Sequence, residues 1–174
     1  MTHTHGLVIV HTGAGKGKTT AALGMALRAA GQNLRVLILQ FIKGGWRYGE
    51  LEALEPLPNI HIRPLGLGLI GDHDDLSPHR QAARTAWDTA VQEVTQGPWD
   101  LIVLDELCVA MHRGFVSTQE VIRLIHQKPP HLHLVITGRH CPEELFPHAD
   151  TVTLMQAVKH HHQAGITAQP GVEF

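Results

Sequence analysis

Short apolar runs alternate with segments of helical spacing along the whole chain. Runs at 7–10, 34–42, 99–106 and 131–139 predict strands, and those at 34–42 and 99–106 are continuous enough for strands buried on both faces of a sheet. Weaker runs at 59–65 and 150–158 predict two more. Each strand except the last leads into a glycine-rich loop, a helical pattern or both, so the strands are separated by crossover connections.

The intervening segments predict helices at 18–31, 77–97 and 117–130 and a short one at 142–149. Gly31 suits a C-cap, Ser77 and Pro78 form a helix-start signal, and a Ser/Thr cap opens the helix at 117. This alternation predicts an α/β fold with a mostly parallel sheet and helices on both faces. We expect one domain over 1–174, with 157–174 as an irregular C-terminal tail.

Two glycine-rich stretches, 43–50 and 66–78, fit neither pattern. In open parallel sheets, ligands bind at the carboxyl ends of the strands, where loops of this kind gather. We therefore expect both stretches to lie near a ligand site.

Composition narrows the class of protein. The 174 residues are 43% hydrophobic, enough for one domain with a core. The net charge of −2 does not favour nucleic-acid binding. No apolar run approaches the ~20 residues of a membrane helix, and no signal peptide is apparent. The two cysteines form no CxxC pair, so we expect free thiols in a cytoplasmic protein without a membrane or nucleic-acid partner.

The loop after the first strand reads HTGAGKGKTT and carries the second half of the phosphate-loop pattern. Thr12 stands at the first glycine position of that pattern. Glycines let backbone N–H groups approach phosphate oxygens, and the following helix adds its positive N-terminus. The order strand, loop, helix predicts a RecA-like phosphate-loop architecture. The expected ATP-binding residues are Gly13, Ala14, Gly15, Lys16, Gly17, Lys18, Thr19 and Thr20.

Further polar groups follow two later strands. Asp105 and Glu106 end the run 99–106, where phosphate-loop proteins hold Mg²⁺ together with the Thr19 hydroxyl. Which carboxylate faces the metal is open, since neighbours on a strand point to opposite faces. An acidic helix cap or a structural ion pair is the alternative, and in a hydrolase Glu106 would polarise water. Arg139 follows the next strand and either reaches an anionic ligand or lies on the surface.

Together these motifs resemble the phosphate-loop type of the ATP:corrinoid adenosyltransferase family, also called cob(I)yrinic acid a,c-diamide adenosyltransferases. The matching stretches are TGAGKGKTTAALGMALRAAG, QFIKGGWRYGE, DLIVLDEL, LVITGRHCPEEL, the AD before TVT, and the KH…GI.AQ.GVEF tail. They occur in the family's order and extend from Gly6 to Phe174, nearly the whole chain. The doubled lysine of the loop and the tail make the resemblance specific.

The resemblance implies a definite reaction, in which a reduced cobalt(I) corrinoid attacks the 5′ carbon of ATP and triphosphate leaves whole. It implies adenosylcobalamin biosynthesis or salvage, Mg²⁺ with the ATP, an electron donor such as a flavoprotein reductase, and a homodimer. It also implies that the nucleotide lies in the loop in the reverse of the usual direction. A nucleotide contact is carried over to Arg28, which by position alone is a helix-surface residue.

The chain departs from the family pattern in two places. Members often carry an N-terminal extension over the active site, and here the chain begins close to the first strand. Members also usually have a GxGFxW segment whose aromatics empty the lower axial position of cobalt; here Leu69 replaces Phe and Gly71 replaces Trp. Trp46 and His73 are candidates to compensate, by their proximity in the sequence. The residues expected on the corrinoid side, or facing ligand, are Trp46, Leu69, Gly71, Arg139 and His160.

Two other functions remain open from the residues. A phosphate-loop ATPase or kinase would use Glu106 on water or an acceptor and produce ADP. A nucleotide-binding regulatory module, suggested by the missing aromatics and lid, would bind ATP without adenosylating a corrinoid.

Overall fold

A six-stranded, all-parallel sheet forms the centre of the molecule. The computed structural model describes residues 5–45, 48–68, 70–71 and 75–173. Neighbouring strands follow the order β3-β2-β4-β5-β1-β6, which confirms the predicted α/β class. The strands are β1 (Val8–Thr12), β2 (Val36–Gln40), β3 (Ile60–Pro64), β4 (Leu101–Asp105), β5 (His133–Thr137) and β6 (Thr151–Leu154).

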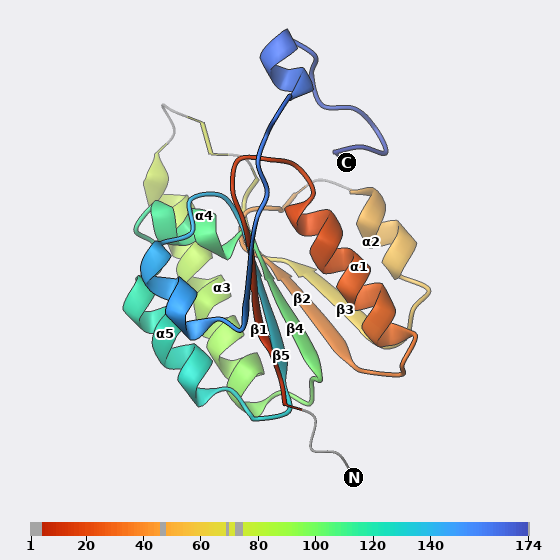
Figure 1. Ribbon diagram of the computed structural model, residues 1–174, viewed down its shortest axis with the longest axis vertical. Coiled ribbons are helices and arrows are strands. Elements are labelled where there is room, and N and C mark those ends of the chain that lie inside the picture. Colours follow the sequence, from red (N-terminus) through yellow and green to blue (C-terminus); the bar gives the residue numbers. More distant parts are fainter. Residues whose placement is uncertain (1–4, 46–47, 69, 72–74, 174) are drawn as a thin grey trace.

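Helices cover both faces of this sheet (Figure 1). One face packs against α1 (Lys18–Ala30), with α2 (Gly49–Leu54) beside it, and the other packs against α3 (Leu76–Gln96), α4 (Leu107–His112) and α5 (Thr118–Gln127). Every residue of β1, β2 and β4 is buried, because these strands have neighbours and helices on all sides. The weaker runs became the edge strands: β3 alternates in exposure, and β6 is exposed throughout.

The structure differs from the predicted elements at several ends. Helix α3 begins one residue before Ser77, because Asp75 is its N-cap and accepts a hydrogen bond from the Ser77 backbone N at 2.9 Å. The 142–149 segment is a 3-10 helix, η1 (Glu143–His148), and the short helices α2 and α4 were not predicted. Strand β6 ends at Leu154 rather than at 158. The chain then leaves the sheet and contains only one further element, the 3-10 helix η2 (His161–Ala164).

The sheet order places three chemically important strand ends side by side. Strands β4, β5 and β1 are consecutive neighbours, so Asp105, Thr137 and the loop after Thr12 meet at the carboxyl end of the sheet.

No helix in the described part of the chain has the length and apolarity to cross a membrane. Both cysteines are free and buried.

Helix α5 begins with a reciprocal capping box, which yields a stability prediction. The Ser117 Oγ accepts from the Glu120 backbone N at 3.3 Å, and the Glu120 carboxylate accepts from the Ser117 backbone N at 2.9 Å. Replacing Ser117 by Ala removes the side-chain half of this box, so we expect Ser117→Ala to lower the free energy of unfolding by about 1 kcal/mol in urea titrations at pH 7. Gln119→Ala, at an exposed position of the same turn, is the matched control; an equal loss in both variants would show that the cap is not the cause.

The same box predicts acid sensitivity. Burial alone would raise the pKa of Glu120, but hydrogen bonds from Ser117 and the Arg84 guanidinium lower it to about 2. The folded pKa lies below the unfolded one, so this contribution to stability is complete above about pH 4.5 and is lost as the pH falls toward 2. Wild type should lose stability over that range, and Glu120→Gln should lose less.

Candidate active site

A cavity of about 420 Å³ lies where the loop after β1, the ends of β4 and β5 and the C-terminal tail meet. The phosphate loop and the start of α1 form its floor. It also receives residues of the 43–50 stretch, as its glycine content led us to expect, whereas no described residue of the 66–78 stretch lines it. The lining residues are Gly15, Lys16, Gly17, Lys18, Thr19, Thr20, Leu23, Lys43, Gly49, Glu50, Glu106, Arg139, Gly171, Val172 and Glu173.

The phosphate loop turns into α1 at Gly17, whose φ of 106° is open to glycine and strained for other residues. Lys18 follows as the first helical residue and is 6% exposed. Its ammonium donates to the carbonyl oxygens of Gly13 at 2.9 Å and Gly15 at 2.6 Å. Burial lowers the pKa of Lys18, and the nearby Glu106 carboxylate opposes that effect. A phosphate oxygen would offer this desolvated ammonium a charged acceptor in place of two carbonyls.

The chain segment after β6 packs against the phosphate loop, and this contact also requires glycines in the loop. The Met155 backbone N donates to the Thr12 carbonyl at 2.8 Å, and the Gly15 N donates to the Met155 carbonyl at 2.7 Å. A Cβ on Gly13 would lie 2.4 Å from the Met155 oxygen, and one on Gly15 would lie 2.8 Å from Gln156. The glycines therefore admit the crossing backbone of residues 155–156.

This close approach makes Gly13 sensitive to substitution. Gly13→Ala adds a Cβ that meets backbone and imposes a φ of 103° on a non-glycine residue. We expect a fall in ATP affinity of at least about tenfold, through displacement of the loop or of 155–156, and a destabilisation of about 2 kcal/mol. Calorimetric ATP titration and urea unfolding measure the two effects.

Gly24→Ala is the matched control, because nothing lies within 4 Å of a Cβ there and the residue is inside α1. It should leave ATP affinity unchanged and stabilise the helix by roughly 0.5–1 kcal/mol. Unchanged ATP affinity in Gly13→Ala would contradict the described loop geometry.

Asp105 is fully buried beneath the cavity and joins three elements. Its Oδ1 accepts from the Thr19 hydroxyl at 2.8 Å and from the Thr137 hydroxyl at 2.7 Å, and its Oδ2 accepts from the Gln40 side-chain amide at 3.3 Å. The first turn of α1 is thereby attached to β4 and β5. The Thr19 and Asp105 oxygens stand in direct contact on the side of the loop where a phosphate-bound cation would lie.

Glu106 occupies a different position from its neighbour. It has a φ of 61°, serves as the N-cap of α4, and lines the cavity, and its backbone N donates to the Thr137 hydroxyl at 2.9 Å. Burial raises the pKa of its carboxyl, and the charge of Asp105 raises it further. Lys18, Arg139 and Lys43 partly offset this rise. Glu106 therefore faces the ligand space, whereas Asp105 supports it from below.

The residues present suit Mg²⁺ that arrives with a nucleotide. No group of three or more His, Cys, Asp or Glu side chains among the described residues could hold a metal ion on its own. Mg²⁺ is commonly held by one or two protein oxygens together with substrate phosphates and water. The Thr19 hydroxyl and the Asp105 carboxylate, 2.8 Å apart, match that donor set.

The structure separates the other residues predicted for the site. Arg139 lines the cavity and is also exposed to solvent, so its position is compatible with both alternatives. Arg28 is exposed in the last turn of α1; at 1.5 Å per residue it lies roughly 15 Å along the helix from Lys18 and does not line the cavity. Gly71 is exposed and is also not among the lining residues. Trp46, Leu69 and His73 lie outside the described residues.

The histidines of the tail form a stack beside the loop. His160 does not line the cavity; its ring stacks on His161 with centroids 4.7 Å apart, and its Nδ1 accepts from the His162 backbone N at 3.3 Å. His161 contacts Glu173, which does line the cavity.

Several residues that line or support the site were missed by the sequence reasoning. Lys43 and Glu50, at the ends of the 43–50 stretch, form an ion pair, and the Lys43 ammonium lies 4.5 Å from the centre of the Tyr48 ring. Thr137, which supports both Asp105 and Glu106, was seen only as part of a strand. Glu173 was part of the tail motif, but no spacing rule connects position 173 with the loop at 16.

Comparison with known proteins shows the family to which the chain belongs. Residues 4–174 match the family described as ATP:corrinoid adenosyltransferase BtuR/CobO/CobP. The corrinoid adenosyltransferase of Escherichia coli K12 is 36% identical over 169 residues, covering 97% of this chain and 86% of that protein. The Pseudomonas aeruginosa enzyme of the same name is 38% identical over 170 residues, covering 97% and 84%. Corrinoid adenosyltransferase CobA of Salmonella typhimurium is 36% identical over 169 residues, covering 97% and 86%. The chain therefore belongs to the ATP:corrinoid adenosyltransferase family.

Proposed function

We propose that this chain transfers the 5′-deoxyadenosyl group of ATP to the cobalt(I) of a corrinoid and releases triphosphate, in adenosylcobalamin biosynthesis or salvage. One observation carries the proposal. The two motifs that mark the family, the doubled-lysine loop and the GVEF tail, come from opposite ends of the chain and line the same cavity. An ordinary phosphate-loop hydrolase has no need of the tail at this place.

In this reaction the cobalt–carbon bond forms as the bond between the 5′ carbon and the triphosphate oxygen breaks, and triphosphate leaves with the electron pair. The nucleophile is the reduced metal of the substrate, so the protein's task is to align the reactants and neutralise the leaving group. The side chains of Lys16, Lys18 and Arg139 meet in the cavity and are suited to the second task. The N-terminus of α1 adds its partial positive charge.

Thr19 and Asp105 would hold the Mg²⁺ that accompanies ATP, since their oxygens already contact each other beside Lys18. The ion would neutralise charge on the triphosphate. Glu106, facing the same cavity, would then contact water or ligand rather than bind the ion directly.

Arg139 and His160 are two of the described residues proposed for the corrinoid side. Arg139 lines the cavity, and His160 stacks on His161, whose ring nitrogen contacts the cavity residue Glu173. Roles for Trp46, Leu69, Gly71 and Arg28 rest on the family resemblance alone. The same holds for a homodimer and for a flavoprotein reductase as electron donor. We treat 1–174 as one working domain with 157–174 as its irregular C-terminal tail.

Anaerobic incubation with chemically reduced cob(I)alamin and MgATP tests the proposal. The corrinoid spectrum should change to that of the adenosylated form, and no change should occur without ATP. ATP hydrolysis to ADP without adenosylation would indicate an ATPase instead. ATP binding with neither reaction would indicate a regulatory module and overturn the proposal.

A further inference from the structure

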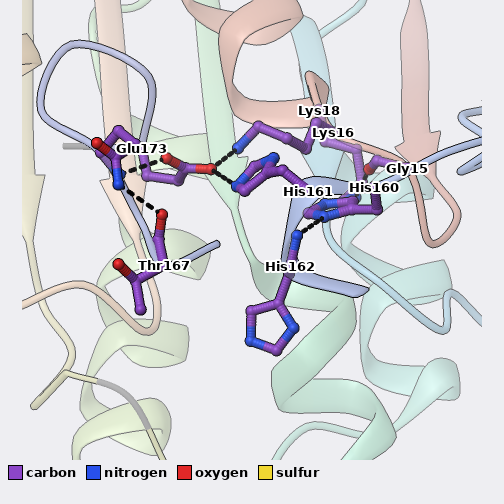
Figure 2. A network of polar contacts seen from close by, with 9 residues as sticks. Gly15, Lys16, Lys18, His160, His161, His162, Thr167 and Glu173 are labelled. Carbon is purple, nitrogen blue, oxygen red and sulfur yellow. Dashed lines mark hydrogen bonds and ion pairs between the residues drawn. The ribbon is translucent and has the colours of Figure 1, made fainter. Parts of the chain in front are cut away.

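The carboxylate of Glu173 contacts the phosphate loop from the far end of the chain (Figure 2). Its Oε1 accepts from the Lys16 ammonium at 2.6 Å and from the His161 Nε2 at 2.8 Å. Its Oε2 accepts from the Gln169 backbone N at 2.8 Å. Three separate segments, the loop, η2 and the last turn of the tail, are thus joined through one side chain.

The tail backbone is shaped to bring Glu173 back to the loop. After 155–156 cross the phosphate loop, η2 ends at Gly165 with a φ of 74°, and a second reversal occurs at Gly171 with a φ of 75°. The Glu173 backbone N donates to the Gln169 carbonyl at 3.0 Å, which closes the final turn. Both reversals require the left-handed conformation that glycine adopts without strain.

The position of this carboxylate conflicts with a bound polyphosphate. Four cationic and three acidic side chains line the cavity, and Lys43 is already paired with Glu50. Glu173 neutralises Lys16, a cation of the phosphate loop itself. Its pKa is lowered to about 2, chiefly by the hydrogen bond from Lys16, so it is an anion at neutral pH. A triphosphate bound at the loop needs the Lys16 ammonium as a partner. It would find the negatively charged Glu173 carboxylate already bound to that ammonium.

We propose that Glu173 is an internal competitor for the polyphosphate: it holds Lys16 in the nucleotide-free protein, is displaced with the tail end when triphosphate binds, and returns to Lys16 as triphosphate leaves. The inference rests on the proposed function for the identity of the anion, because triphosphate is the product of that reaction. The contact itself is independent of the reaction, so any inorganic polyphosphate should compete with it.

Calorimetric titration of the full chain with inorganic tripolyphosphate and Mg²⁺ tests this competition. Glu173→Gln keeps the shape of the side chain and removes its charge, so the dissociation constant should fall roughly fivefold. Glu143→Gln, at an exposed position of η1, removes one negative charge away from the cavity and should leave the dissociation constant unchanged. An unchanged or larger dissociation constant in Glu173→Gln would overturn the proposal, and a larger one would mean that the contact persists and closes the site.

Repeating the titration in a Lys16→Met variant shows whether the effect of Glu173→Gln on the dissociation constant depends on Lys16. In Lys16→Met the partner of Glu173 is gone, so adding Glu173→Gln should change the dissociation constant by less than about twofold. An equal fall in both backgrounds would overturn competition for Lys16 and leave only a general charge effect. Adenosyl transfer is not measured in this titration, so failure of the proposed function and failure of the competition give separate results.

Hydrogen exchange gives an independent readout of tail displacement. The Gln169 backbone N–H is held by Glu173 in the nucleotide-free protein, so saturating tripolyphosphate should speed its exchange at least about fivefold. The Leu134 N–H, bonded to the Leu7 carbonyl beside β1, is the internal reference and should not change. Slower exchange at Gln169 would contradict displacement.

Discussion

Lys18→Ala should lose at least about 1,000-fold in the rate of adenosyl transfer from MgATP to cob(I)alamin, because it removes the one loop cation that begins α1. The Lys18 ammonium is buried at the cavity floor, where its interaction with phosphate is little screened by water. Adenosylation followed by the corrinoid spectrum measures the loss. Calorimetric titration with MgATP should show a parallel loss of binding.

The fold should survive this substitution. Lys18 donates to two carbonyls of the phosphate loop rather than to the hydrophobic core, and burial already disfavours its charge. The midpoint of thermal unfolding should therefore stay within a few degrees of wild type. Arg123→Ala, at an exposed position of α5, is the control for loss of a positive charge and should transfer at the wild-type rate. Wild-type transfer by Lys18→Ala would show that the assigned loop is not the site.

The second large effect is expected at Asp105. Asp105→Ala removes the acceptor for Thr19, Thr137 and Gln40 in a fully buried place, so we expect a loss of about 3 kcal/mol in the free energy of unfolding. Transfer activity should fall by at least about 100-fold, because Thr19 loses its partner and Mg²⁺ its carboxylate. Urea unfolding and the adenosylation rate measure the two effects separately.

Asp105→Asn separates the metal role from stability. Its oxygen can still accept from both threonines, and a rotated Gln40 amide can offer its own oxygen, which has no hydrogen-bond partner in the described structure, to the new NH₂ group. We therefore expect a loss below about 1.5 kcal/mol in stability, but still about 100-fold in transfer at low Mg²⁺. Glu106→Gln is the comparison and should keep the wild-type Mg²⁺ requirement. The reverse pattern would assign the ion to Glu106.

The strands were predictable because a buried strand needs apolar residues along its whole length, and such a run is visible in the sequence. The runs at 34–42 and 99–106 became fully buried β2 and β4, and the alternating 59–65 run became edge strand β3. Elements set by tertiary contacts were not predictable. Helix α4 is one and a half turns long and starts from the strained Glu106, and β6 stops early because Met155 bonds to the phosphate loop.

The site residues also fall into those that a local motif predicts and those that only tertiary contacts bring to the site. Local motifs placed the loop, Asp105, Glu106 and Arg139 at neighbouring strand ends, where the sheet brings them together. Thr137 and Glu173 carry no local signal, since each acquires its role from a partner far away in the chain. Arg28 shows the opposite case: the family resemblance gave it a nucleotide contact, yet within this chain it lies at the far end of α1 from the loop.

The central claim is that triphosphate leaves as one piece when the cobalt–carbon bond forms. Phosphorus NMR of the anaerobic reaction, run alongside the corrinoid spectrum, measures it most directly. We expect one triphosphate for each adenosylated corrinoid, and no ADP, pyrophosphate or phosphate above the level of an enzyme-free control. Adenosylation with cleaved phosphates, or ADP formed without adenosylation, would contradict the account.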